Sequence, residues 1–199
     1  MTQYFDEQPD VPSDRRVVDV ALADVGFTML TDRGVFSHGR LDVGTSLLLR
    51  QAPPPSPRGH LLDLGCGSGS IALTLGLRSP EATVWAIDVN ARARRLTAIN
   101  AERNGLENVR VAAPDELPED IGFSTIWSNP PIRIGKSGLH QLLLRWLPRL
   151  TDDGDAILVV QKHLGADSLQ RWLTAEGFSC DRIASRTGFR LLHCRRRRT

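Results

Sequence analysis

The sequence predicts an α/β protein built on a doubly wound, mostly parallel sheet of seven strands. From residue 60 onward, short apolar segments alternate with amphipathic helical segments, as in successive βα units. A glycine-rich turn, GCGSG at 65–69, follows the first apolar segment of this series. The last two apolar segments follow one another without a helix between them, so we expect an antiparallel strand at one edge of the sheet.

A small amino-terminal appendage, residues 1–51, is expected ahead of that alternation. It begins with a polar, proline-containing stretch at 1–14. Two strands of a hairpin and a short helix follow, at 16–22, 26–31 and 41–50. The proline-rich segment APPPSPRG at 52–59 breaks any periodicity and separates the appendage from a core at 60–199. We expect the two parts to form one compact unit.

Within the core, the apolar periodicity predicts seven strands and four helices. The expected strands are 60–64, 83–88, 109–113, 124–128, 156–161, 179–185 and 189–194. The expected helices are 68–77, 91–104, 138–150 and 166–175. Ligands of such sheets bind at the carboxyl ends of the strands, so residues just after each strand are the candidate site.

The composition indicates an ordinary globular domain. The 199 residues are 41% hydrophobic and 24% charged, and no apolar stretch approaches the roughly 20 residues that span a bilayer. The polar, acidic amino terminus does not resemble a signal peptide. Cys66, Cys180 and Cys194 form no CxxC pair and no metal-ligand spacing, so we expect a reduced, cytoplasmic protein without a metal or a membrane partner.

The net charge is only +2, but arginines are concentrated in the last twenty residues. They are Arg182, Arg186, Arg190 and the run 195–198. Such a run is either a solvated surface or a surface that contacts phosphates. The charge pattern alone leaves both interpretations open.

The glycine loop at 65–69 predicts a ligand close to the backbone. Glycines allow this approach, and the following helix offers unpaired N–H groups. The spacing is GxGxG with Ser70 next, so the dinucleotide fingerprint GxGxxG fails at its last glycine. Asp63, just ahead of the loop, favours a cationic ligand over a pyrophosphate. Asp88, which ends the next expected strand, is placed to accept hydrogen bonds from ribose hydroxyls.

A second candidate site is the segment SNPPIRIG, which follows the strand at 124–128. Pro130 and Pro131 end that strand and hold Asn129 extended at its carboxyl end. The Asn129 side-chain oxygen and the Pro130 carbonyl oxygen are two rigid acceptors. They suit the exocyclic amine of a nucleobase, or an amide. The delocalised lone pair of such a nitrogen makes it a poor nucleophile, so it needs correct positioning more than it needs a proton acceptor.

Together these segments resemble the class I S-adenosylmethionine-dependent methyltransferases, over about residues 61–192, with their Rossmann-like fold. Asn-Pro-Pro is similar to the (D/N/S)PP(Y/F) motif of members that methylate conjugated amines. The resemblance implies S-adenosyl-L-methionine as methyl donor and S-adenosyl-L-homocysteine as product. Catalysis is implied for Asn129, Pro130 and Pro131. The donor contacts it implies are Asp63, Gly65, Cys66, Gly67, Gly69, Asp88, Asn90, Asp115 and Asn129; Cys66 on its own reads as a packing residue.

A closer resemblance covers almost the whole chain. The chain is similar to the small-domain methyltransferases related to the RsmC ribosomal RNA guanine-N2 enzymes. The similarity lies in five segments: YFDEQP, TDRGVFSHGRLDVGTSLLL, DLGCGSG, SNPPIRIGK and TGFRLL. This implies methylation of guanine N2 in 16S ribosomal RNA, free or in the assembled subunit. It adds Phe36, Asp42, Thr45 and Ser46 as candidate pocket residues, although capping of an ordinary helix by Asp42 or Thr45 explains these residues equally well.

The chain departs from the family in two ways. Ile132 stands where many relatives carry an aromatic residue, so stacking on the base is weaker. The length leaves no room for the second, degenerate domain of the best-known relatives. We therefore expect RNA contacts from the appendage, from Arg133 and Lys136, from the arginine-rich carboxyl end or from a homodimer, while a monomer also remains open.

Two other functions compete with this hypothesis. One is a glutamine N5-methyltransferase of release factors, which shares the Asn-Pro-Pro chemistry but usually has tyrosine at the position of Ile132. The other is a methyltransferase-like RNA-binding module without turnover. Retention of the glycine loop and of Asn129 disfavours this second alternative.

Overall fold

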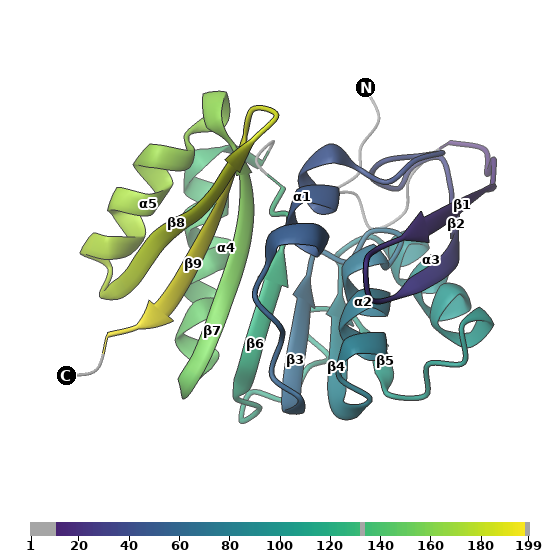
Figure 1. The fold of residues 1–199 in the computed structure, drawn as a ribbon, viewed down its shortest axis with the longest axis horizontal. Coiled ribbons are helices and arrows are strands. Elements are labelled where there is room, and N and C mark those ends of the chain that lie inside the picture. Colours follow the sequence, from purple (N-terminus) through teal and green to yellow (C-terminus); the bar gives the residue numbers. More distant parts are fainter. Residues whose placement is uncertain (1–10, 132–133, 198–199) are drawn as a thin grey trace.

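A seven-stranded sheet runs through the middle of the molecule in the order β5-β4-β3-β6-β7-β9-β8 (Figure 1). The computed structural model describes residues 11–131 and 134–197. The strands are β3 (Arg58–Leu64), β4 (Glu81–Ile87), β5 (Val109–Ala112), β6 (Phe123–Ser128), β7 (Leu150–Gln161), β8 (Phe178–Arg186) and β9 (Phe189–Arg196). Within this sheet, β9 alone runs opposite to the other six strands, and it lies between β7 and the edge strand β8. The predicted fold class is thus confirmed, with the antiparallel strand one place in from the edge.

The helices cover both faces of this sheet (Figure 1). They are α1 (Val43–Gln51), α2 (Ser70–Arg78), α3 (Ala91–Arg103), α4 (Gly135–Trp146) and α5 (Ala166–Ala175), with 3₁₀ turns η2 (Leu147–Arg149) and η3 (Lys162–Leu164). One core cluster joins α4 and α5 to the sheet around the fully buried Trp146 and Phe123. A second joins α1 and α2 to the opposite face around Trp127. In the described ranges no helix is long and apolar enough to cross a membrane.

The direction of strand addition reverses between β3 and β6. The chain passes from β3 to β4 and β5 on one side, then returns to β6 on the other side. The Ser128 hydroxyl at the end of β6 donates to the Leu64 carbonyl at the end of β3, at 2.6 Å, and joins the two ends. A crevice forms at such a switch point, so the loops after Leu64 and Ser128 face the same space.

The appendage consists of the two-stranded sheet β1 (Arg16–Ala21) and β2 (Gly26–Thr31) followed by α1. The Asn100 side chain on α3 exchanges hydrogen bonds with both backbone groups of Leu30, at 2.7 and 2.8 Å. Arg78 at the end of α2 forms an ion pair with Asp24 in the hairpin turn. These bonds attach the hairpin to the helices beside the glycine loop.

Helix α1 begins against the first residue of β9. A Cβ at Gly44 would lie 2.7 Å from the Phe189 ring, closer than real Cβ contacts, so only glycine leaves room for that ring. This contact explains why the segment LDVG, which contains Gly44, and the segment TGF, which contains Phe189, occur together in this chain. It also brings the β8–β9 turn close to the entrance of α1.

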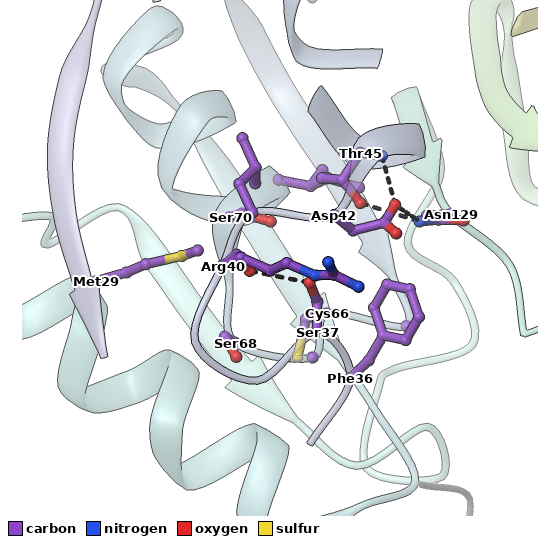
Figure 2. A pocket seen from close by; sticks show the side chains of 14 residues that line it. Met29, Phe36, Ser37, Arg40, Asp42, Thr45, Cys66, Ser68, Ser70 and Asn129 are labelled. Atoms are coloured by element: carbon purple, nitrogen blue, oxygen red, sulfur yellow. Dashed lines mark hydrogen bonds between the residues drawn. The ribbon is translucent and has the colours of Figure 1, made fainter. Parts of the chain in front are cut away.

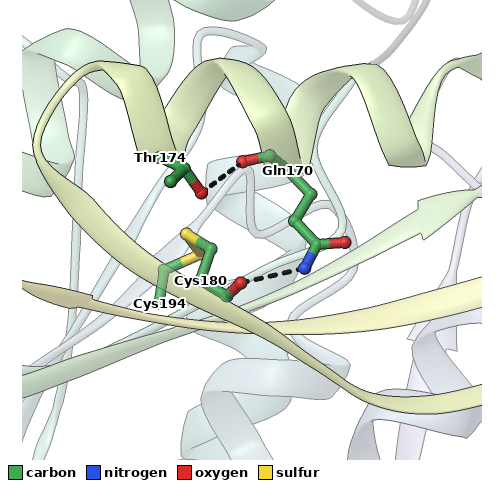
Figure 3. The surroundings of a disulfide bond; sticks show 4 residues. All are labelled: Gln170, Thr174, Cys180 and Cys194. Carbon is green, nitrogen blue, oxygen red and sulfur yellow. Dashed lines mark hydrogen bonds between the residues drawn. A yellow bond between two sulfur atoms is a disulfide. The ribbon is translucent and has the colours of Figure 1, made fainter.

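Two cysteines that the sequence led us to expect reduced form a disulfide (Figure 3). Cys180 on β8 and Cys194 on β9 are directly opposite in the antiparallel register and are bonded under α5. Gln170 on α5 donates to the Cys180 carbonyl at 2.9 Å. The expectation was wrong because cysteine spacing does not report strand register, which brings residues 14 apart into contact. Cys66 is free and buried.

Reduction of this disulfide is expected to lower the free energy of unfolding by about 3 kcal/mol, the usual contribution for a closed loop of this length. Urea unfolding with and without dithiothreitol measures the difference. The variant Cys66→Ser is the control, because it keeps the disulfide and should show the same loss on reduction. Equal stabilities in the two conditions would contradict the prediction.

Candidate active site

The glycine loop connects β3 to α2 at the switch point. Gly65, Gly67 and Gly69 all have positive φ, at 83°, 54° and 90°. The Gly65 and Cys66 N–H groups both donate to the Ile87 carbonyl at the end of β4, at 2.9 Å. A Cβ at Gly65 would meet nothing within 4 Å, whereas at Gly69 it would lie 2.9 Å from the Thr97 methyl group. The loop is therefore anchored on its inner side and presents open backbone on its outer side.

Asp88 holds this loop from the next strand. One carboxylate oxygen accepts from the Gly67 N–H at 3.0 Å, and the other accepts from the Asn90 N–H at 2.9 Å. Burial raises the pKa of Asp88 above the ordinary aspartate value, and these two hydrogen bonds and Arg94 offset part of the shift. The sequence placed Asp88 at the end of a strand beside the loop, and the structure does the same.

Asp63 lies behind the loop and is fully buried. One of its oxygens accepts from the Ala72 N–H in the first turn of α2 at 2.9 Å. The other is buried without a hydrogen-bond partner among the described residues. Burial raises the pKa of Asp63 well above its usual range. The side chain thus supports the helix start and is absent from the pocket lining.

The pocket lies between the glycine loop, α1 and the segment ahead of α1 (Figure 2). It brings together several residues that the sequence singled out from distant segments. They are Phe36, Asp42, Thr45, Gly65, Cys66, Gly67 and Asn129. Burial raises the pKa of the Cys66 thiol, which keeps it protonated, so Cys66 contributes to the pocket wall and is a poor nucleophile.

The side chain of Asn129 is held by two residues of the α1 entrance (Figure 2). Its Nδ2 donates to Asp42 Oδ2 at 2.8 Å and to Thr45 Oγ1 at 3.0 Å. Asp42 Oδ2 also accepts the Thr45 N–H at 2.8 Å as the N-cap of α1. An ionised carboxylate can only accept, so it requires the amide nitrogen on its side and turns the Asn129 oxygen away. Asp42 therefore both caps α1 and lines the pocket, two roles that the sequence left as alternatives.

Two of the expected donor contacts have other partners. The Asn90 oxygen caps α3, accepting from the Arg92 and Ala93 N–H groups, and its Nδ2 donates to the Gly34 carbonyl. The Asp115 side chain is 89% exposed and forms an ion pair with Arg145 on α4. Neither residue lines the pocket, nor do Asp63, Gly69 and Asp88, and the donor contacts of all the expected residues stay predictions.

The residues after Asn129 are placed in part. Pro130 is buried and Pro131 half-buried. Ile132 and Arg133 lie outside the described residues. Lys136 is exposed in the first turn of α4, in a groove that α4 forms with α5. Ser46 lies on α1 next to Thr45, outside the pocket lining.

Sequence reasoning missed several residues of the pocket. They are Met29, Ser37, Arg40, Leu41, Ser68, Ser70 and Ile71. Arg40 and Ser68 carry the most chemistry: Arg40 is an exposed guanidinium, and the Ser68 hydroxyl is buried without a partner among the described residues. Arg40 could have been found from its place in GRLDVGT, two residues before Asp42. Ser68 gave no signal beyond its position inside the glycine loop.

Three features define a Rossmann-like methyltransferase. They are the reversed strand order, the GxGxG loop held by an acid after the next strand, and the Asn-Pro-Pro segment at the switch point. The chain belongs to the methyltransferase small domain family, whose match spans residues 26–193.

Two relatives illustrate the similarity. A Bacillus subtilis (strain 168) protein described as uncharacterized, YbxB, is 37% identical over 168 residues, which are 83% of this chain and 84% of that protein. The ribosomal RNA small subunit methyltransferase C of Ectopseudomonas mendocina (strain ymp) is 36% identical over 199 residues, 94% of this chain but 57% of that enzyme. The chain thus spans little more than half the length of such curated methyltransferases.

A solved structure shows the same fold. The T. thermophilus 16S rRNA N2 G1207 methyltransferase RsmC, in complex with AdoMet and guanosine, matches with a TM-score of 0.70 at 24% identity. The match covers 95% of this chain and 52% of that one.

Proposed function

We propose that this protein transfers a methyl group from S-adenosylmethionine to the N2 amine of guanine in 16S ribosomal RNA. The observation that carries the proposal is the orientation of Asn129. Its amide nitrogen is bound to Asp42 and Thr45, and its oxygen has no donor among the described residues. An acceptor held in this way suits an amine, not a carbonyl or a phosphate.

The pocket fits the donor that the family uses. A Cβ at Gly65 would project into open space, and the unpartnered Ser68 hydroxyl lies in the same wall. The residues that would hold S-adenosylmethionine are the backbone of 65–69, Phe36 and Thr45, with Asp88 at the ribose. The donor supplies an electrophilic methyl group on a sulfonium ion.

The chain itself supplies position and charge complementarity. The Asn129 oxygen and the Pro130 carbonyl each accept one N–H of the substrate amine, which directs the nitrogen lone pair toward the methyl group. Positive charge develops on the nitrogen during transfer, and both acceptors stabilise it. As the new N–C bond forms, the sulfonium S–C bond of the donor would break, and the methylated nitrogen becomes acidic enough to lose its proton to water, so a dedicated base is unnecessary.

Similarity to the ribosomal RNA methyltransferases favours guanine in RNA as the substrate. The base must leave its stack to reach Asn129, which costs least at unpaired nucleotides. We infer a cytoplasmic location from this substrate. Ile132 in place of an aromatic residue continues to disfavour release-factor glutamine as the substrate.

Incubation with tritiated donor and three acceptors tests the proposal. The acceptors are small ribosomal subunits, naked 16S ribosomal RNA and release factor. We expect label in RNA, recovered as N2-methylguanosine after nucleoside analysis. Label confined to the release factor would overturn the RNA assignment, and donor binding without label in any acceptor would favour a binding module.

Substitution Asp88→Ala is expected to weaken donor binding about 10–100-fold, the equivalent of one or two charge-assisted hydrogen bonds. The Gly67 N–H would lose its acceptor along with the ribose hydroxyls. Since burial raises the pKa of Asp88, donor affinity should also fall on acidification from a higher pH than an ordinary aspartate would give. Titration calorimetry across pH measures both effects. Asp152→Ala on β7 is the control, since its side chain is 90% exposed and it is neither a pocket residue nor an expected donor contact. An unchanged affinity in Asp88→Ala would contradict the role.

A further inference from the structure

Four exposed cations come from separate segments at the carboxyl end of the parallel strands. They are Arg40, Lys136, Lys162 and Arg186. Arg40 lines the same pocket as Asn129 (Figure 2). Lys136 is the second residue of α4 and lies seven positions after Asn129. Arg40 thus shares the pocket of Asn129, and Lys136 begins the helix that follows the Asn-Pro-Pro segment.

Lys162 and Arg186 extend this set along the sheet. Lys162 directly follows β7, the parallel neighbour of β6, whose end carries Asn129. The Lys162 N–H donates to the Gly188 carbonyl at 2.8 Å, which joins η3 to the β8–β9 turn beside Arg186. The contact between Phe189 and Gly44 then places this turn next to the α1 entrance.

None of these four cations forms an ion pair or a side-chain hydrogen bond with any of the residues that the structure describes. Other cations at this end do: Arg190 pairs with Asp167, and Arg33 with Asp14. Uncompensated cations around a pocket attract a polyanion. We call Arg40, Lys136, Lys162 and Arg186 the basic rim.

The last described arginines, Arg195, Arg196 and Arg197, lie at the end of β9, at the other end of the sheet (Figure 1). Strand β9 starts opposite Gln161, at the end of the sheet where Asn129 follows β6, and reaches Arg195 opposite Asp155. Six residues of strand correspond to about 20 Å. The Debye length is about 8 Å at physiological ionic strength, so these charges are screened from the site.

We infer that the basic rim binds the phosphates that flank the target nucleotide, and that the carboxy-terminal arginines do not take part. The inference rests on the proposed function, because an extruded nucleotide keeps a phosphate on each side. Under this inference the arginines near the carboxyl end fall into two groups. Arg186 beside the β8–β9 turn binds RNA phosphates, and the arginines from Arg195 onward do not.

Two double variants with the same change in charge test this division. One is Lys162→Gln with Arg186→Gln, and the other is Arg195→Gln with Arg197→Gln. All four residues are exposed, and none of them lines the donor pocket. Binding of fluorescently labelled 16S ribosomal RNA is measured by anisotropy at several salt concentrations, and donor affinity by calorimetry.

The rim variant is expected to bind RNA more weakly and to reduce the salt slope by about 0.7 for each lost phosphate contact. The carboxy-terminal variant should bind like the wild type, and both should keep wild-type donor affinity. Equal effects, or a larger loss in the carboxy-terminal variant, would overturn the inference while leaving RNA methylation intact. If the wild type labels only release factor and does not bind RNA, both this inference and the proposed function fail.

Discussion

Replacing Asn129 with alanine is expected to lower the rate of methyl transfer by about 10²–10³-fold or more, the usual loss when a preorganised polar group is removed from a reacting centre. The variant loses the acceptor that orients the amine. Donor affinity should be nearly unchanged, because the glycine loop and Asp88 remain in place. Single-turnover transfer with tritiated donor measures the rate, and calorimetry measures donor binding.

A loss of folding would imitate this result, so the thermal unfolding midpoint is the necessary control. Asn129 is only half-buried, and its removal leaves Asp42 capping α1 through the Thr45 N–H. We therefore expect a small change in stability. An Asn129→Ala enzyme that still transferred methyl groups at the wild-type rate would show that another group accepts the amine.

Substitution Asn129→Asp is expected to be nearly as damaging as Asn129→Ala, although aspartate occupies this position in some methyltransferase motifs. In this chain the new carboxylate would face Asp42 Oδ2 at the 2.8 Å distance now bridged by an N–H. Two carboxylates at that distance cannot both stay ionised without strong repulsion. The side chain would turn away or take up a proton, and either outcome misplaces the acceptor.

Adding Asp42→Asn to the Asn129→Asp variant is expected to restore at least about a tenth of the lost activity. Residues in contact usually have coupling free energies of about 0.5–3 kcal/mol. The amide at position 42 can donate to the new carboxylate and relieve the repulsion, but α1 then loses the Thr45 N–H cap, because one oxygen now accepts both bonds; we therefore expect partial recovery. Asp42→Asn alone is the matched control and should cost little, since its oxygen can still accept from Thr45 and Asn129. Activity of Asn129→Asp with native Asp42, or no gain in the double variant, would contradict the proposed orientation.

Several elements follow directly from local sequence. The hairpin strand Gly26–Thr31 and the helix Ala166–Ala175 have the predicted bounds, because their apolar periodicity ends at glycine or at polar turns. The helix expected over 138–150 instead spans Gly135–Trp146, and β7 begins already at Leu150. Pro148 lies in the 3₁₀ turn between them, and proline ends an α-helix because it lacks the N–H and fills the preceding turn. Pro148 is therefore a local signal for the end of this helix.

By itself the sequence determined the order of strands and helices along the chain, the place of the glycine loop and the position of Asn129 at a strand end. These are local properties, set by periodicity, glycine and proline. Only the tertiary structure decided which way the Asn129 amide points, since Asp42 and Thr45 lie 87 and 84 residues away in the chain. It likewise decided that Cys180 meets Cys194 and that Arg195 lies at the end of the sheet opposite to the site. Strand register and direction govern these contacts, and neither can be read from the residues that make them.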